Sequence, residues 1–234
     1  MKDYTIDIEG STVVVTGGQR GIGRALVGEL LDRGAAKVYA TARSPKPSSN
    51  PRIETVALDV TDADSVAALP QMATDATVVI NNAGIFPATR LLSGDFEEIR
   101  AVFETNYFGA LRIARAFAPI LARNGGGALV DIHSVLSWLA GSGSYGDSKA
   151  ALWSATNSLR MELEPQGTLV IGVHLAYTDT DMVKDVEAPK NDPNDVARRI
   201  VDAVENGDTE VLVDEITRHF KAALSGPVEG LQMR

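Results

Sequence analysis

A short run of β-branched residues leads directly into a glycine-rich loop, and this junction constrains the fold more than any other part of the chain. Residues 12–16 (TVVVT) have the composition of a buried strand. The loop Gly17-Gly18-Gln19-Arg20-Gly21-Ile22-Gly23 follows, and residues 21–33 then show a helical pattern that ends at Gly34. A strand, a glycine turn and a helix in this order predict the first unit of a parallel sheet.

The loop glycines have separate roles if the turn holds a phosphate group. Gly17 permits a tight turn, Gly21 lets a pyrophosphate approach the backbone, and Gly23 lets the helix pack closely on the strand. The free N–H groups at the start of the helix attract an anion. The spacing Gly-x-x-x-Gly-x-Gly is neither the commoner Gly-x-Gly-x-x-Gly nor a Walker loop. We predict a dinucleotide-binding turn, with a purely structural turn as the alternative.

Strand and helix patterns alternate along the remaining chain. Strands are expected at 12–16, 37–41, 53–58, 77–80, 128–133, 168–174 and 210–213, and helices at 21–33, 61–69, 95–102, 105–123, 145–163 and 195–205. Thr61 with Asp64 is expected to start one helix, and Asn194 to cap another. Strands that are apolar throughout indicate a sheet covered on both faces. The predicted fold class is α/β: a single doubly wound, Rossmann-type domain over residues 1–234, with a mostly parallel seven-stranded sheet.

Composition excludes several classes of function. The 234 residues contain 22 Lys and Arg against 31 Asp and Glu, and a net charge of −9 argues against nucleic acid or an anionic membrane as partner. The absence of cysteine excludes disulfides, thiolate nucleophiles and zinc–thiolate sites. No apolar run approaches the ~20 residues of a membrane span. We expect a cytoplasmic protein without a metal site, in which His133, His174 and His219 are structural.

Tyr145 and Lys149 are four residues apart within a predicted helix, so they share one face. A cation beside a phenol lowers the phenol's pKa from its usual ~10, because it stabilises the phenolate. Such a tyrosine can exchange a proton with a carbonyl or alcohol oxygen near neutral pH. A chance pair on a solvated helix face is the alternative, and this spacing alone favours it.

Seven features in this order together resemble the short-chain dehydrogenase/reductase family, over nearly the whole chain. They are the loop 16–23, Asp59-Val60, Asn81-Asn82-Ala83-Gly84, Asn106, Ser134, Tyr145 with Lys149, and Thr180. The resemblance implies hydride transfer between a nicotinamide cofactor and a ketone, an aldehyde or a secondary alcohol.

The resemblance also implies the catalytic roles. Tyr145 would be the general acid and base, and Lys149 would tune it and bind the nicotinamide ribose. Ser134 would hold the substrate oxygen, and Asn106 would organise a water that relays protons to Lys149.

Two departures from the family pattern bear on this site. The loop 135–144 is about two residues shorter than is usual in the family, so Ser137 is an alternative to Ser134. Leu175-Ala176 stands where the family usually has Pro-Gly, which leaves the backbone near the nicotinamide less free.

The cofactor-binding set that the loop and the resemblance imply is Gly17, Gln19, Arg20, Gly21, Ile22, Gly23, Arg43, Ser44, Asp59, Val60, Asn82, Ala83, Gly84, Tyr145, Lys149, Thr178 and Thr180. Asp59 would accept a hydrogen bond from the adenine amine, and Val60 would pack on the ring. Thr180 would bind the nicotinamide carboxamide. The alternatives are a turn before Thr61 for Asp59 and a helix cap for Thr180.

The end of the second predicted strand indicates which nicotinamide binds. An NAD site places an acid there to hold the ribose 2′-hydroxyl, but this chain reads Thr41-Ala42-Arg43-Ser44. Arg20 in the glycine loop is a second cation. Two guanidinium groups and a hydroxyl suit a 2′-phosphate, so NADP(H) is predicted over NAD(H). The alternative is two solvated surface arginines.

The positions expected to face the nicotinamide are mostly apolar: Ile85, Phe86, Leu136, Trp138, Tyr177, Met182 and Val183. They predict an uncharged carbonyl or alcohol substrate with an apolar body, with ordinary core packing as the alternative. A short lid over about 182–193 predicts an open pocket or a lid that orders on cofactor binding. The resemblance also implies a homodimer or homotetramer.

Two other functions remain in competition. One is a non-catalytic NADP(H)-binding sensor or docking module, which the presence of both Tyr145 and Lys149 disfavours. The other is a sugar-nucleotide epimerase, which the short segment after Thr180 disfavours.

Overall fold

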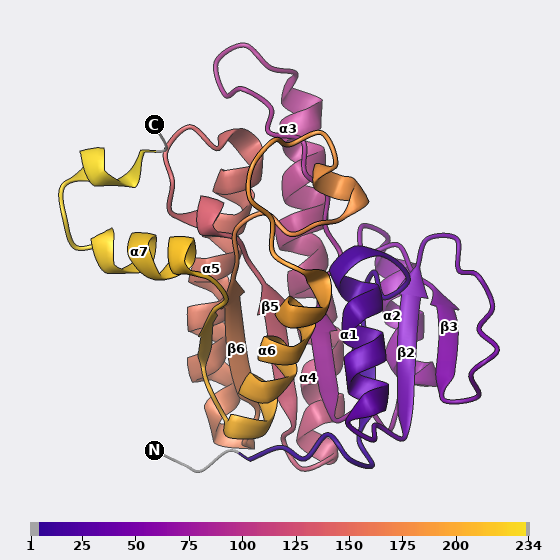
Figure 1. Ribbon diagram of the computed structural model, residues 1–234. Coiled ribbons are helices and arrows are strands. Elements are labelled where there is room, and N and C mark those ends of the chain that lie inside the picture. Colours follow the sequence, from indigo (N-terminus) through magenta and orange to yellow (C-terminus); the bar gives the residue numbers. More distant parts are fainter. Residues whose placement is uncertain (1–4, 233–234) are drawn as a thin grey trace.

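A seven-stranded parallel sheet forms the centre of the computed structural model, which describes residues 5–232 (Figure 1). The strands are β1 (Thr12–Val15), β2 (Lys37–Ala42), β3 (Ile53–Ala57), β4 (Val78–Asn81), β5 (Ala128–Ile132), β6 (Leu169–His174) and β7 (Glu210–Leu212). Their order is β3-β2-β1-β4-β5-β6-β7, and every pair is parallel. The predicted doubly wound Rossmann-type fold is confirmed, with all strands parallel.

Helices cover both faces of this sheet. They are α1 (Gly21–Asp32), α2 (Ala63–Met72), α3 (Phe96–Phe103), α4 (Ala110–Arg123), α5 (Gly143–Leu163), α6 (Pro193–Asn206) and α7 (Glu215–Ala223). Short turns of helix are η1 (Glu104–Gly109), η2 (Val135–Ser137), η3 (Glu164–Gln166), η4 (Asp181–Val183) and η5 (Val228–Leu231). Figure 1 shows α1 and α6 side by side on one face, with α2, α4 and α5 behind the sheet.

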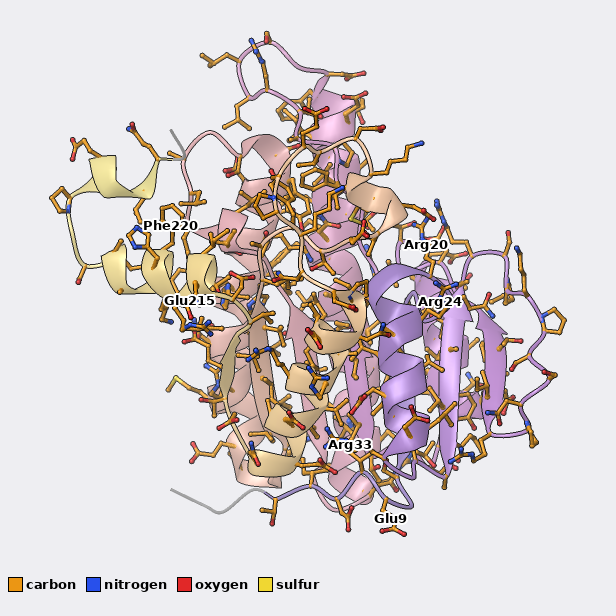
Figure 2. The ribbon with its side chains drawn as sticks, in the orientation of Figure 1. Glu9, Arg20, Arg24, Arg33, Glu215 and Phe220 are labelled. Carbon is orange, nitrogen blue, oxygen red and sulfur yellow. The ribbon has the colours of Figure 1, made fainter. Side chains whose placement is uncertain are left out.

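The strands divide their side chains between two apolar cores, because successive residues of a strand point to opposite faces. Val13 and Val15 of β1 pack under α1 and α6, whereas Val14 packs on the other face with Phe117 of α4. On the first face, Arg33 at the end of α1 binds Asp202 (2.6 Å) and Glu205 (2.5 Å) of α6. This ion-pair cluster lies at the end of α1 that is remote from the glycine loop (Figure 2).

Two predicted helix starts are wrong, and the reason is the same in both. Asp62 caps α2 by accepting the N–H groups of Asp64 and Ser65, whereas Thr61 donates to Asp59. Asp192 caps α6 by accepting the N–H of residue 194, so the helix begins at Pro193. In each case a neighbouring carboxylate takes the capping position.

The helices predicted at 95–102 and 105–123 form one continuous rod in which η1 is a turn of π-helix. A π turn widens the helix by one residue, and such turns frequently occur at functional sites. Within residues 5–232, no helix combines the length and apolar composition needed to cross a membrane.

Phe117→Ala should lower the free energy of unfolding by about 3–5 kcal/mol, because Phe117 is fully buried and its removal leaves a cavity. Phe96→Ala is the matched control, since Phe96 is 62% exposed and should cost less than about 0.5 kcal/mol. Chemical denaturation of both variants measures the difference. Equal losses would contradict this assignment of the core.

Candidate active site

The carboxyl ends of β1, β4, β5 and β6 meet at one edge of the sheet, and polar residues follow each of them. Ligands of open parallel sheets bind at this edge, where the strand order reverses between β1 and β4. Four groups of predicted residues lie here: the loop after β1, the Asn82 segment after β4, Ser134 after β5 and the Thr178–Thr180 segment after β6.

The glycine loop has the backbone geometry that its sequence requires. Gly17 and Gly21 have positive φ angles of 66° and 50°, which residues with a side chain rarely adopt. A Cβ on Gly23 would lie 2.2 Å from the carbonyl oxygen of Gly17. Asn82 ties the loop to β4, since its Nδ2 donates to the carbonyl of Thr16 (2.9 Å) and its backbone N–H donates to Thr16 Oγ1 (2.9 Å).

The side chain of Ser134 lies next to the hydroxyl of Tyr145 and lowers the pKa of that tyrosine. Ser134 Oγ also accepts the N–H of Leu136 (3.1 Å), which holds the serine in place. Ser137 Oγ, by contrast, is buried without a hydrogen-bond partner among residues 5–232. The structure thus brings Ser134, and not Ser137, to the tyrosine.

Burial opposes ionisation of both Tyr145 and Lys149. It raises the pKa of Tyr145 to about 12, although the side chain of Ser134 acts in the other direction. It lowers the pKa of Lys149 to about 8, with Asp131 opposing the shift. The predicted lowering of the Tyr145 pKa is therefore wrong for this geometry. The Lys149 ammonium donates its hydrogen bond to the carbonyl of Ile132 (2.7 Å).

Asn106 lies buried in the π turn η1 and joins two segments of the site. Its Oδ1 accepts the N–H of Ile85 (2.9 Å), and its Nδ2 donates to the carbonyl of Ile85 (3.0 Å) and to Ser148 Oγ (3.1 Å). These bonds hold the Asn82–Phe86 segment against α5. The water that Asn106 is expected to organise stays a prediction.

Aromatic side chains gather beside Tyr145. The ring of Phe86 meets the Tyr145 ring edge-on with centroids 4.6 Å apart, and lies 6.4 Å from the ring of Tyr177. Met182, in the turn η4, is 46% exposed. Trp138 instead stacks on His174 at 4.0 Å and packs against Trp153, which is the core-packing alternative.

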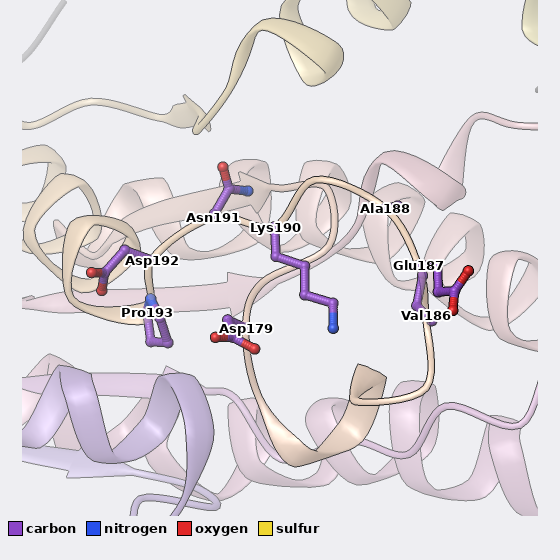
Figure 3. Close-up of a pocket in the computed structure, with 8 residues that line it drawn as sticks. All are labelled: Asp179, Val186, Glu187, Ala188, Lys190, Asn191, Asp192 and Pro193. Atoms are coloured by element: carbon purple, nitrogen blue, oxygen red, sulfur yellow. The ribbon is translucent and has the colours of Figure 1, made fainter.

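The predicted lid is closed at its base by backbone hydrogen bonds. Asn191 donates its N–H to the carbonyl of Tyr177 (2.8 Å) and accepts the N–H of Asp179 (2.9 Å). A cavity of about 490 Å³ lies inside this segment, and Figure 3 shows Lys190 and Asp179 among the residues that line it. Val183, the last residue of the turn η4, is buried.

Asp214 is a positioning residue that the sequence patterns did not predict. Its Oδ1 caps α7, and its Oδ2 accepts both the N–H of Ala176 and the amide of Asn191, each at 2.8 Å. The backbone of the unusual Leu175-Ala176 step is therefore held from the side by α7. An Asp ahead of a Thr three residues on is a capping signal, but no signal in the sequence indicates the second contact.

The comparisons with known proteins agree with one another. A family model described as short chain dehydrogenase matches residues 11–191. Ketoacyl reductase HetN of Nostoc is 32% identical over 230 residues, covering 89% of this chain and 80% of HetN. The 3-oxoacyl-acyl-carrier-protein reductase FabG of Vibrio cholerae is 30% identical over 76% of this chain and 78% of that protein. A crystal structure of a short chain dehydrogenase from Burkholderia cenocepacia in complex with NADP superposes with a TM-score of 0.91, at 37% identity over 97% of each chain.

The chain belongs to the short-chain dehydrogenase family. Its members are oxidoreductases that bind a nicotinamide cofactor. Whether this chain can hold such a cofactor depends on three regions. They are the N-terminus of α1, the neighbouring arginines, and the segments after β3 and β6.

The N-terminus of α1 is built differently from those of most other helices in the described part of the chain. An aspartate side chain caps each of α2, α3, α6 and α7. In α1 the capping position is Arg20, which makes no side-chain hydrogen bond to the helix, and no acid stands in the first turn. The first N–H groups of α1 therefore remain available to an anion, as a pyrophosphate requires.

Arg20 and Arg43 are both exposed and lie near this helix end. Neither forms a salt bridge with any residue between 5 and 232. The adjoining loop is fixed by Gln19, which donates to the carbonyl of Lys46 (2.8 Å) and accepts its N–H (2.9 Å). Figure 2 shows Arg20 and Arg24 at the upper end of α1.

Asp59 forms a turn with Thr61, which is the alternative to the predicted adenine contact. Its Oδ1 accepts the N–H (2.9 Å) and the hydroxyl (2.7 Å) of Thr61, and these bonds, with the charge of Arg43, lower the pKa of Asp59. Val60 is buried and packs against Gly109. Thr180 begins η4 without using its hydroxyl as a cap, and Thr178 is buried beside Ala176. The adenine and carboxamide contacts stay predictions.

Gly23→Ala should weaken binding of the nicotinamide cofactor at least about tenfold and destabilise the fold by about 1–3 kcal/mol, because the new methyl group would displace the Gly17 carbonyl or Asn82. Gly28→Ala in the same helix is the control, since an added Cβ there would meet no atom within 4 Å; it should gain about 0.5–1 kcal/mol. Fluorescence titration and denaturation test both. Unchanged affinity in Gly23→Ala would contradict the close packing.

Proposed function

We propose that this short-chain dehydrogenase is an NADPH-dependent oxidoreductase that transfers a hydride reversibly between the nicotinamide and a ketone, an aldehyde or a secondary alcohol. The observation that carries the proposal is that the buried side chains of Tyr145 and Ser134 lie next to each other, at the sheet edge where the uncapped end of α1 also lies. A carbonyl oxygen at this point would receive hydrogen bonds from both.

The bound cofactor supplies or accepts the hydride at the nicotinamide C4. In the reduction, Tyr145 donates its proton to the oxygen that gains negative charge, and Ser134 donates a hydrogen bond to the same oxygen. A pKa of about 12 supports this direction, since Tyr145 then carries its proton at neutral pH. In the oxidation, Tyr145 must first lose that proton, so alcohol oxidation is expected to accelerate as pH rises.

The preference for NADP(H) rests on Arg20 and Arg43. They are exposed cations beside the end of β2, where an NAD site carries an acid. The Burkholderia relative, which is a complex with NADP, supports the same choice. The aromatic group of Phe86 and Tyr177 beside Tyr145 supports a substrate with an apolar body.

Tyr145→Phe should reduce the rate of NADPH-dependent carbonyl reduction by about 10²–10⁴-fold, because it removes the proton donor and little else. Its affinity for NADPH should stay within about twofold. Absorbance at the wavelength of reduced nicotinamide, with a panel of aliphatic, aromatic and bicyclic ketones and aldehydes, measures the rate. Tyr107→Phe on η1 is the control and should retain full activity. Retained turnover in Tyr145→Phe would exclude the role; NADPH binding without turnover in the unaltered protein would favour the sensor instead.

Arg43→Asp should weaken NADPH binding by about 10–100-fold, because one charge-assisted hydrogen bond to the 2′-phosphate is lost and an acid replaces it. NADH binding should be unchanged or improved, since the acid can accept from the 2′-hydroxyl. Arg123→Asp, at an exposed site at the C-terminal end of α4, controls for the change in net charge. Titration with each cofactor gives the ratio, and a ratio equal to that of the control would exclude Arg43 as a phosphate ligand.

A further inference from the structure

Four buried polar side chains form a chain of hydrogen bonds beneath the active site. Asp131 Oδ2 lies 2.7 Å from Thr156 Oγ1, which lies 2.8 Å from His133 Nε2. His133 Nδ1 lies 3.2 Å from His174 Nε2, and His174 Nδ1 lies 3.3 Å from the backbone carbonyl of Ser134. The exposed fraction of each of the four side chains is 2% or less.

The carbonyl at the end of this chain sets the direction of every hydrogen bond in it. A carbonyl only accepts, so His174 must donate from Nδ1. A neutral His174 then accepts at Nε2 from Nδ1–H of His133, which in turn accepts at Nε2. The donor to that nitrogen is Thr156, which has a single hydrogen.

The remaining contact then requires a hydrogen on the carboxyl group. Thr156 has one hydrogen and donates it to His133, so it cannot also donate to Asp131. For the same reason it does not donate to the carbonyl of Leu152, which lies 2.8 Å away. The 2.7 Å contact between Thr156 and Asp131 must therefore contain the proton of a neutral carboxyl. The other oxygen, Oδ1, accepts the amide of Asn81 (2.9 Å), which leaves Oδ2 to carry this proton.

The ionisation of the individual groups agrees with this direction. Burial lowers the pKa of His174 to about 3 and that of His133 well below its usual range, so both imidazoles are neutral. Burial raises the pKa of Asp131.

We propose that Asp131 and His174 are positioning residues: the chain keeps Asp131 neutral and fixes the backbone of Ser134. An ionised Asp131 would raise the pKa of Lys149. A neutral Asp131 instead leaves the ammonium of Lys149 without a buried counter-ion among residues 5–232, one helical turn from Tyr145. The catalytic consequence rests on the proposed function, whereas the protonation of the chain does not.

Charged groups from the neighbouring elements do not disturb this arrangement. Arg160 of α5 donates to the carbonyls of Val170 and Thr209. Glu210 of β7 lies 3.9 Å from His174 Nε2, but its Oε1 is bound to Lys221 of α7 at 2.5 Å. The Lys221 ammonium also lies over the rings of Trp138 and Trp153. Glu210 is thus already compensated and leaves His174 neutral.

Nitrogen-15 NMR of the histidine side chains tests the direction of the chain directly. The sequence contains only three histidines, and the exposed His219 is assigned with His219→Gln. At pH 7 we expect both His133 and His174 to carry their hydrogen on Nδ1. Asp131→Asn should leave both tautomers unchanged, because the new amide donates to Thr156 as the protonated carboxyl does. If both histidines instead carry their hydrogen on Nε2 in the unaltered protein and on Nδ1 in Asp131→Asn, then Asp131 is ionised and the proposal is overturned.

His174→Phe tests whether the chain keeps Asp131 neutral. The ring keeps its stacking on Trp138 but cannot accept from His133, so His133 should move its hydrogen to Nε2 and Asp131 should ionise. The infrared C=O band of a protonated carboxyl should be present in the unaltered protein, absent in Asp131→Asn and absent in His174→Phe. The ionised Asp131 of His174→Phe should also raise the pKa of Lys149, which shifts the pH dependence of turnover upward. A band that persists would overturn the proposal. Neither spectroscopic measurement needs substrate, so a failure of the proposed function would leave both results standing.

The pH dependence of stability gives a third measurement if His174→Phe does not fold. Because the pKa of Asp131 is raised in the folded state, folding takes up a proton at this group, and the contribution of Asp131 to stability falls as pH rises above the unfolded value of 3.8. Asp131→Asn should therefore have the higher Tm at pH 8, and this gain should vanish near pH 4. Asp75→Asn, at an exposed acid paired with Lys37, is the control and should show no such gain. A lower Tm for Asp131→Asn at pH 8 would overturn the proposal.

Discussion

The hydrogen bonds that join Thr16 and Asn82 across the ends of β1 and β4 hold together the two halves of the sheet at the point where the strand order reverses. Helices that follow β1 and β4 depart to opposite faces there, and the backbone would otherwise leave a gap with unpaired polar groups. Asn82 fills this gap and sets the height of the glycine loop above the sheet. Asn82 therefore fixes the positions of the glycine loop, the start of α1 and the Asn82–Phe86 segment relative to one another.

The reaction site itself is buried more deeply than its chemistry alone would require. A phenol, an ammonium, a carboxyl and two imidazoles all lie within the sheet edge and α5, and each carries a desolvation cost. Hydrogen bonds to backbone carbonyls and between side chains offset that cost, and neutral forms of Asp131 and both histidines reduce it further. Some buried polar atoms still have no hydrogen-bond partner among the described residues, for example Asn81 Oδ1, Ser137 Oγ and Trp138 Nε1.

Local patterns were enough to predict the sheet and most of its helices, because strand and helix periodicity depends on neighbours in sequence, whereas most site residues at the sheet edge came from the family resemblance. They failed where a distant residue decides the outcome. The pKa of Tyr145 depends on burial by segments such as Phe86, about sixty positions earlier. The chain from Asp131 to His174 likewise pairs residues 23 to 41 positions apart, and nothing in the spacing of His133 and His174 indicates it.

The π turn at η1 carries one residue more than an α-helix would need over the same length. Each residue of an α-helix turns the chain by about 100°, so deleting a single residue from η1 would restore regular winding and rotate α3 against α4 by that angle. Asn106 would then leave Ile85, and the apolar face of α3 would turn away from α5. The junction between α3 and α4 is thus intolerant of length change although it lies inside a helix.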